Sequence, residues 1–418
     1  MNAPDVRFHH VRVALDEPVI KNIRAHTDLA LAGCGVELPA GGRVAIAIGS
    51  RGIADLLAVV ERVAAWVRDQ GATPFLVPAM GSHGGATAAG QREVLESYGF
   101  GNDATLSIVS NMETVELPRG DCPVPVWTDA EAGRADATIV INRVKPHTDF
   151  HGPYESGLMK MIAIGLGKQK QADALHAYGQ RGLRDFMPLV ARQVLAHGNV
   201  VLGVAIVENA LDATMAVEAI RADRIPDEEP RLLALAREHS PRLPMEQLDV
   251  LLIDRMGKDI SGVGIDTNVI GRTMITGSVD PELPRINMIA CHSLTPASHG
   301  NATGVGLADV VTAHLADAID HDVTRTNIIT SGFLLRGKLP VVAPDDQTAW
   351  EWCLRGAGVV DVHAVRAARI VDTLHCADLW VSDAVLKDLA EAVAAGLIDV
   401  LASDRALHDE HRKLSPFR

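Results

Sequence analysis

The chain has 418 residues and a formal net charge of −14, with 47% hydrophobic, 22% charged and 4% aromatic residues. A single hydrophobic core rarely grows beyond about 250–300 residues, so this length predicts two domains. The acidic balance and the few aromatic residues argue against nucleic-acid binding, which depends on a basic surface that neutralises phosphates. We therefore expect a small-molecule ligand.

Sequence features that would direct the chain to a membrane or an oxidising compartment are missing. The first 18 residues contain acids and no apolar core, and apolar runs such as VVLGVAIV are far shorter than the roughly 20 residues of a membrane span. We expect a cytoplasmic protein with no membrane partner. The cysteines are scattered without a CxxC pair, which predicts reduced, mostly buried thiols, so a metal ion would depend on histidines. They are Cys34, Cys122, Cys291, Cys353 and Cys376.

Short strand-like runs alternate with helical stretches along the first half of the chain. The first run, RVAIAIGSRG, breaks at glycine and is followed by apolar residues at helical spacing. This alternation predicts the α/β class, with Rossmann-like parallel sheets covered by helices. The predicted strands are 43–52, 73–80, 136–144 and 200–209, and the predicted helices are 53–71 and 88–99.

A polar, proline-bearing passage over 220–247 precedes a new strand-like run, LDVLLIDRMG. This change in composition predicts a domain boundary near residue 245. The two predicted domains are 1–245 and 246–418, and the second ends in a helical tail over 382–397.

The densest cluster of reactive side chains follows the predicted strand that ends near Asn142. Residues 143–179 contain three histidines and four lysines among glycines and small apolar residues. Ligands of α/β proteins bind at the carboxyl ends of parallel strands. Lys160 stands out, because GLMKMIAIGLG surrounds its amine with apolar residues. Desolvation disfavours the ammonium and favours a nucleophile or covalent anchor, and the alternative is a lysine that extends out of an apolar helix into solvent.

Two glycine-rich passages are further candidates for a ligand site. His83 in GSHGGAT follows a predicted strand, and this turn could expose backbone amides to a phosphate or carboxylate while the imidazole acts as a base. A turn histidine without a function is the alternative. The second passage, DISGVGIDTNVIGR, brings together Asp266, Asn268 and Arg272, either as a loop that closes over a ligand or as a solvated surface loop.

The ordered set of these residues resembles the nickel-dependent lactate racemase family over most of the chain. His83 in MGSHGGAT and His147 in KPHTDF look like the two catalytic histidines of that family. Lys160 in ESGLMKMIAIG looks like its anchoring lysine, and His176 in ADALHAYG looks like its nickel-ligating histidine.

Other motifs match the family less closely. Ser50 and Arg51 in GSRG resemble the end of its Asp-x-Thr-Arg motif, and GVGIDTN resembles its Gly-x-x-x-Asp-x-Asn stretch, with Asp266 and Asn268 in place. The tyrosine, glutamine and lysine that follow this stretch in the family are replaced here by VIGRTM, which leaves Arg272 as the nearest cation.

The resemblance implies an isomerase, a racemase or epimerase that inverts C2 of a small 2-hydroxy acid. It implies hydride transfer to a nickel-pincer nucleotide, a pyridinium mononucleotide with thioamide and thiocarboxylate groups, covalently bound to Lys160. His83 and His147 would be the two bases, and His176 would complete the nickel ligands, since imidazole suits nickel.

The resemblance also assigns roles to other residues, the domains and partners. Ser50, Arg51 and Lys168 would contact the cofactor, and Asp266, Asn268 and Arg272 would contact the substrate. The N-terminal domain would bind the cofactor and the C-terminal domain would close over the substrate, with the active site in the interdomain cleft. Enzymes that synthesise the cofactor and insert nickel are the expected partners, and a homo-oligomer is left open.

Two other functions fit the sequence. His147, Asp149 and His151 form a His-x-Asp-x-His pattern that could hold zinc or iron in a divalent-metal lyase or hydrolase. A non-catalytic homologue that binds 2-hydroxy acids would explain the missing residues after Asn268.

Overall fold

The computed structural model describes residues 6–15, 17–49, 52–102 and 105–417. They form two compact units, a first unit over Glu17–Ser240 and a second unit that joins Met1–Asp16 to Pro241–Arg418. The predicted boundary at residue 245 lies close to the end of the first unit. The prediction assigned the N-terminal segment to the wrong domain, because β1 (Arg7–Val13) pairs with β14 (Asp378–Ser382) and β15 (Ile398–Ala406) of the second unit.

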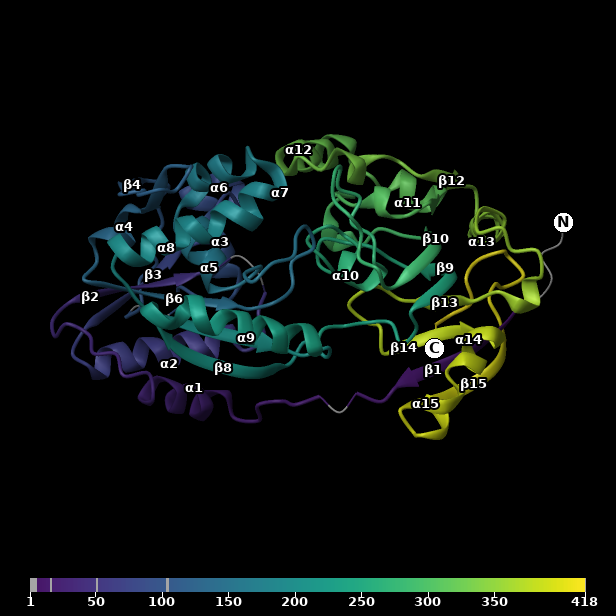
Figure 1. Ribbon diagram of the computed structural model, residues 1–418, viewed down its shortest axis with the longest axis horizontal. Coiled ribbons are helices and arrows are strands. Elements are labelled where there is room, and N and C mark those ends of the chain that lie inside the picture. The colour runs from purple at the N-terminus through teal and green to yellow at the C-terminus, as the bar shows by residue number, and fades with distance from the viewer. Residues whose placement is uncertain (1–5, 16, 50–51, 103–104, 418) are drawn as a thin grey trace. The chain divides into compact units, whose positions relative to one another are not determined.

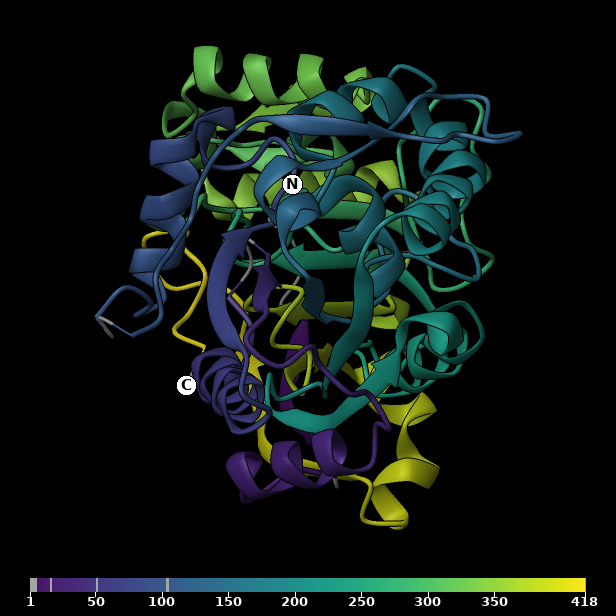
Figure 2. The same cartoon turned by 90° about the vertical axis from the view of Figure 1, so that its left-hand side faces the viewer.

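The first unit is built on a five-stranded sheet in the order β3-β2-β6-β7-β8 (Figures 1 and 2). All neighbouring strands are parallel except β7 and β8, which form an antiparallel pair. A separate antiparallel pair is formed by β4 and β5. The strands are β2 (Arg43–Ile48), β3 (Thr73–Pro78), β4 (Thr114–Leu117), β5 (Val126–Asp129), β6 (Ala137–Arg143), β7 (Val200–Glu208) and β8 (Thr214–Arg221).

Side chains of β2 alternate between two hydrophobic cores, because successive residues of a strand face opposite sides of the sheet. Val44 and Ile46 pack with α2 on one face, while Ala45 and Ala47 belong to the core that contains α8, α9 and residues 158–166. The sheet is therefore covered on both faces. The helices are α1 (Ile23–Ala32), α2 (Leu56–Asp69), α3 (Ala88–Ser97), α4 (Ala130–Arg134), α5 (Leu158–Lys160), α6 (Lys168–His176), α7 (Gly179–Arg181), α8 (Met187–His197) and α9 (Ile225–Glu238).

The second unit contains an eight-stranded mixed sheet in the order β12-β11-β10-β9-β13-β14-β1-β15. The strands from β12 to β13 are parallel, and β14, β1 and β15 continue the sheet antiparallel. The remaining strands are β9 (Gln247–Ile253), β10 (Arg285–Cys291), β11 (Val310–Thr312), β12 (Val341–Ala343) and β13 (Ala367–Ile370).

Helices of the second unit are mostly short. The predicted helical tail is divided into α14 and α15 and ends before β15, which the sequence did not reveal. The helices are α10 (Thr267–Ile270), α11 (Ala313–Asp317), α12 (His321–Ser331), α13 (Asp346–Gly356), α14 (Asp383–Asp388) and α15 (Ala390–Ala394).

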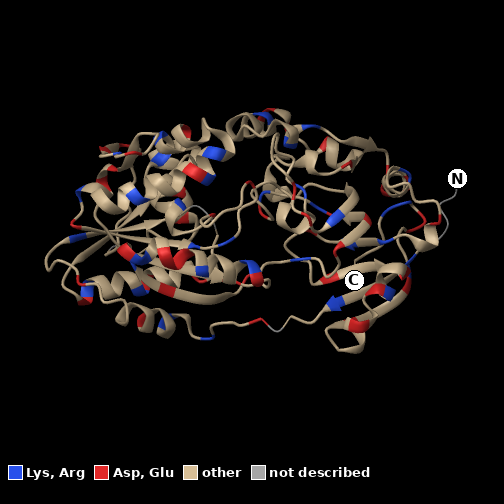
Figure 3. Ribbon diagram, in the orientation of Figure 1, with Lys and Arg blue, Asp and Glu red and all other residues tan. Residues whose placement is uncertain are grey.

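Several predictions from composition can be compared with this fold. All five cysteines are free and buried, as predicted. Within the described residues, every helix is too short or too polar to cross a lipid bilayer. Acidic and basic residues are interspersed along both units (Figure 3).

Candidate functional site

The candidate site lies at the carboxyl edge of the first unit's sheet. Because β3, β2 and β6 are parallel, the segments that follow them leave the sheet at the same edge. His83 follows β3, and His147 follows β6. The sheet therefore places at one edge two turns that are 64 residues apart in the sequence numbering.

The segment that carries Lys160 packs closely against this edge. A Cβ atom on Gly49, just after β2, would lie 3.3 Å from Cε of Met161. The Gly81 amide, just after β3, donates to the carbonyl of Gly165 at 3.4 Å. A Cβ on Gly81, whose φ is +60°, would lie 3.1 Å from Cγ2 of Ile164. Small residues at these strand ends thus allow the Lys160 segment to approach.

Lys160 and His147 are in direct contact. Lys160 is the last residue of α5, which continues into a fully buried π-helical segment, Met161–Gly165. Its side chain is only partly buried, and its Nζ lies 2.5 Å from Nε2 of His147. The apolar helix is thus anchored in the core while its single amine reaches the loop after β6.

The imidazole of His147 is oriented by its own loop. The main-chain N–H of Asp149 donates to Nδ1 of His147 at 3.1 Å, and the ring packs on Phe150 with centroids 4.7 Å apart. The backbone N–H of His147 donates to Oε2 of Glu155 at 2.6 Å. These contacts turn Nε2 of His147 toward Lys160.

Glu155 is a fully buried carboxylate that organises this loop. Oε1 accepts hydrogen bonds from the Gly152 amide at 3.0 Å and from Arg237 at 2.5 Å, and it lies 3.2 Å from Nδ1 of His151. Burial alone would raise the pKa of Glu155, but the hydrogen bonds from His151, His147 and Arg237 outweigh it and lower the pKa. Glu155 therefore stays ionised and holds the loop together.

His176 belongs to the same neighbourhood. It is the last residue of α6 and is partly buried. Burial lowers its pKa, the positive charge of Lys160 when protonated lowers it further, and Asp149 and Asp173 act in the opposite direction. A histidine with a lowered pKa is neutral at pH 7 and offers a nitrogen lone pair, which a metal ion requires.

Glu229 is a residue of this region that the sequence did not reveal. It lies on α9, is fully buried, and accepts a hydrogen bond from the Met159 amide at 2.7 Å, directly before Lys160. Its Oε1 is buried without a hydrogen-bond partner, and a Cβ on Gly157 would lie 2.3 Å from that atom. Burial raises the pKa of Glu229 to about 7, although the amides of Met159 and Leu158 act against this effect. Local sequence patterns do not indicate Glu229 as part of this region, because it lies in a charged helix 70 residues after Met159.

His83 lies on an exposed turn at the edge of the site. The side chain is exposed, and the turn is fastened from beneath by Gln91, whose amide donates to the carbonyls of Gly81 at 2.9 Å and His83 at 3.2 Å. Ser50 and Arg51, the other residues expected near this edge, lie outside the described residues.

Lys168 has a different environment from the one predicted. Its side chain is 0% exposed, and Nζ lies 2.9 Å from Oδ2 of Asp129, which is also 0% exposed. The same amine donates to the carbonyl of Pro78 and, at 3.3 Å, to Gln91. This placement argues against the predicted contact with a cofactor and favours a structural role, because the ammonium is already surrounded by buried acceptors.

The three residues predicted to bind substrate bond within the second unit. Asp266 accepts hydrogen bonds from the backbone and side-chain amides of Asn268 at 2.9 and 3.0 Å and so caps α10. Arg272 pairs with Asp309 at 2.8 Å and donates to the carbonyls of Leu307 and Ile286 at 3.1 Å. These bonds give the guanidinium of Arg272 a role in the fold of the loop, and its predicted contact with substrate stays a prediction.

The His-x-Asp-x-His pattern does not form a metal site in this structure. His147 turns Nε2 to Lys160, and His151 turns Nδ1 to Glu155. Across the described ranges, no group of three or more His, Cys, Asp and Glu side chains is arranged to hold a metal ion. A metal ion with a single protein ligand, as expected for His176, does not require such a group.

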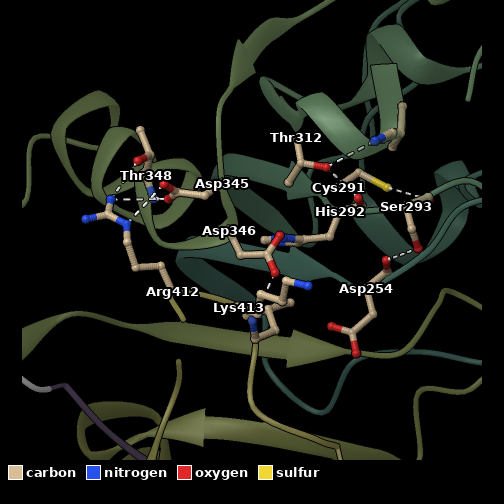
Figure 4. Close-up of polar contacts among 12 residues, drawn as sticks. Asp254, Cys291, His292, Ser293, Thr312, Asp345, Asp346, Thr348, Arg412 and Lys413 are labelled. Atoms are coloured by element: carbon tan, nitrogen blue, oxygen red, sulfur yellow. Dashed lines mark hydrogen bonds and ion pairs between the residues drawn. The ribbon is translucent and has the colours of Figure 1, made fainter. Parts of the chain in front are cut away.

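A second polar cluster lies at the carboxyl edge of the second unit's sheet (Figure 4). Nδ1 of His292 lies 2.9 Å from Oδ1 of Asp346, and the other carboxylate oxygen accepts from the Leu414 amide at 2.9 Å. The carbonyl of His292 accepts from Thr312 at 2.5 Å, and Asp345 pairs with Arg412 at 3.0 Å. These contacts fasten the end of the chain to the sheet, which is a structural role.

Comparison with known proteins identifies a shared fold. No protein-family model and no curated protein matches the sequence. Among solved structures, the lactate racemase apoprotein of Thermoanaerobacterium thermosaccharolyticum superposes with a TM-score of 0.50 at 11% identity, over 88% of this chain and 99% of that chain. The chain shares the fold of a lactate racemase. This confirms the predicted α/β class. A protein of Thermotoga maritima matches with a TM-score of 0.46 at 12% identity, over 67% of this chain and 72% of that chain.

Proposed function

We propose that the protein is an isomerase, a racemase or epimerase that inverts C2 of a small 2-hydroxy acid with a nickel-pincer nucleotide bound to Lys160. The observation that carries this proposal is the contact between Lys160 and His147, with His176 in the same neighbourhood, at the carboxyl edge of the sheet. A fold shared with a lactate racemase supports it.

The residues present fit such a cofactor at its tether and at its metal. Lys160 presents an amine at the surface of an otherwise buried helix, where a covalent bond can form. His176 is neutral at pH 7, so its imidazole can ligate nickel, for which nitrogen and sulfur are suitable donors. When bound, the group would supply a hydride acceptor for the C2 hydrogen of the substrate.

The chain itself would manage the hydroxyl proton. His147 is oriented by Asp149 and Phe150, which limits the loss of side-chain freedom when it meets a substrate. His83 lies on a turn that Gln91 fastens at two carbonyls. A histidine side chain has a pKa near 6.5 in model peptides, so it can accept and return a proton near neutral pH. General acid–base catalysis of this kind typically contributes ~10²–10⁴ in rate.

Intact-protein mass spectrometry tests the tether. Wild-type protein and the variants Lys160→Arg and Lys170→Arg would be co-expressed with enzymes that make the cofactor, and mass and bound nickel would be measured. We expect an adduct and nickel in wild type and in Lys170→Arg, whose lysine is exposed, and neither in Lys160→Arg. An unmodified wild-type protein under conditions that load a known lactate racemase would count against the proposal.

The reaction is tested separately with loaded protein. Small 2-hydroxy acids of increasing length would be incubated with it and analysed by chiral chromatography. We expect one of them to reach a mixture of both C2 configurations, and His83→Ala to lose at least about 100-fold in rate while it retains the adduct. Binding of these acids without any inversion would favour the non-catalytic homologue.

A further inference from the structure

The hydrogen bonds around His147 determine which of its nitrogens carries hydrogen. A main-chain N–H can only donate, so the Asp149 amide, 3.1 Å from Nδ1, requires a lone pair on that nitrogen. A neutral imidazole has one N–H, and with Nδ1 unprotonated this hydrogen must lie on Nε2. The loop geometry thus selects one tautomer of His147.

The same tautomer constrains the charge of Lys160. Nε2 of His147 lies 2.5 Å from Nζ of Lys160, so its hydrogen points at that amine. An ammonium group has three donors and no lone pair, so it would oppose one N–H with another. An uncharged amine has a lone pair and can accept the hydrogen bond.

The opposite tautomer of His147 fits the distances less well. In this reverse arrangement Nδ1 carries the hydrogen and directs it at the carboxylate of Asp149. Nε2 is then unprotonated and can accept a hydrogen bond from a Lys160 ammonium. That carboxylate oxygen is 3.7 Å from Nδ1, which is beyond hydrogen-bond distance, whereas the Asp149 amide is at 3.1 Å. The amide would then face an N–H group.

The surroundings of Lys160 also favour the uncharged form. Leu158, Met159 and Met161 on either side of it are buried, and desolvation disfavours an ammonium. Titratable groups of this neighbourhood include His147 and Asp149, from the loop after β6, and His176 on α6.

We propose that the Asp149 amide, through His147, holds Lys160 as an uncharged nucleophilic amine that reacts with acyl-type carbon electrophiles before any cofactor is attached. This deepens the proposed function and rests on it for the use of Lys160, but it concerns the unmodified protein. A nitrogen bonded to a carbonyl or thiocarbonyl carbon is a poor acceptor. Attachment at Lys160 therefore ends this contact, and the Nε2 hydrogen of His147 can then be donated to another acceptor.

Acetylation of the unmodified protein measures the charge of Lys160. With N-acetoxysuccinimide the amine nitrogen bonds to the acetyl carbon, N-hydroxysuccinimide leaves with the electron pair, and the proton lost from nitrogen passes to the buffer. An ordinary lysine of pKa about 10.4 is unprotonated in roughly one molecule in 2,500 at pH 7, so its rate rises about tenfold per pH unit. Peptide mass spectrometry would follow each lysine from pH 6.5 to 9.5.

We expect the rate at Lys160 to be nearly constant over this range, while the rate at Lys170, which is exposed in the same segment, rises about tenfold per pH unit. The slope is independent of accessibility, so partial burial of Lys160 does not affect the comparison. A slope at Lys160 equal to that at Lys170 would overturn the proposal. The result does not depend on the cofactor, so it is distinguishable from a failure of the proposed function.

Two variants separate the amide of Asp149 from its carboxylate. Asp149→Asn keeps the main-chain N–H, so the acetylation rate of Lys160 should stay within about twofold of the wild-type rate at each pH. The reverse arrangement depends on the carboxylate and predicts that this variant changes the pH profile. His147→Phe keeps the ring packing on Phe150 and removes the donor, so the rate at Lys160 at pH 7 should fall at least about tenfold.

Nitrogen NMR of histidine-labelled wild-type protein gives an answer that needs no variant to fold. We expect Nδ1 of His147 to show the chemical shift of an unprotonated ring nitrogen and Nε2 that of a protonated one. The opposite pattern would overturn the proposal.

Discussion

Glu229 shows how a single buried carboxyl group can work against the stability of the fold while it holds the segment that carries Lys160. Its Oε2 caps the amide of Met159, and its Oε1 has no partner in the buried space beside Gly157. An ionised carboxylate with half of its hydrogen-bonding capacity unused is costly in an apolar interior. This cost raises the pKa of Glu229 to about 7.

Glu229→Gln should therefore stabilise the protein at alkaline pH. The pKa of Glu229 is raised in the folded state, so the unionised form is favoured, and stability is lost as pH rises from about 4.5 through about 7. Glutamine keeps an oxygen for the Met159 amide and does not ionise. Between pH 5 and pH 8 the free energy of unfolding of the variant should rise relative to wild type by about 2 kcal/mol.

Urea denaturation at the two pH values measures this difference. Glu238→Gln, on the exposed end of the same helix, is the matched control and should show no such change. A Glu229→Gln protein that parallels wild type at both pH values would mean that Glu229 titrates normally.

At the scale of elements, the ion pair of Lys168 and Asp129 joins the start of α6 to the end of β5. Lys168 also binds the carbonyl of Pro78 at the end of β3 and the side chain of Gln91. Gln91 in turn holds the turn that carries His83. One buried amine thus connects the helix that ends at His176 to the elements around His83.

Removing one partner of this pair should be far more harmful than removing both charges. Lys168→Met leaves Asp129 as an uncompensated buried charge and should cost about 3–5 kcal/mol of stability. The double variant Lys168→Met/Asp129→Asn keeps an oxygen that can cap α4 and removes the charge, so it should be more stable than the single variant. Thermal unfolding of both proteins decides this, and a double variant less stable than Lys168→Met would contradict it.

Patterns within a short stretch of sequence account for the elements that were predictable. The runs at β2, β3, β6 and β7 are rich in β-branched residues and bounded by turns, and the spacing along α2 is helical. The same local patterns single out Lys160 and the histidines near it. They do not reveal Glu229 or the pairing of Lys168 with Asp129, because those contacts join residues 70 and 39 positions apart.

At the scale of the whole molecule, the main error of prediction concerns β1. The strand RFHHVRV is short and mixes apolar residues with histidine and arginine on both of its faces, so the sequence around it does not indicate which sheet it enters. Its partners β14 and β15 lie near the other end of the chain. A boundary derived from composition near residue 245 identifies where the first unit ends. It assigns the N-terminal segment to that first unit, whereas the structure places this segment in the second.

This topology predicts unequal behaviour of fragments. Residues 17–240 contain a complete sheet with a core on each face, so they should fold alone and show a cooperative thermal transition by circular dichroism. Residues 241–418 lack β1, which lies between β14 and β15 and buries Phe8 and Val11, so they should fail to fold cooperatively. Fusing residues 1–16 to that fragment through a flexible linker should restore the transition, because β1 regains both partners. Cooperative folding of 241–418 by itself would show that β1 is dispensable for the second unit.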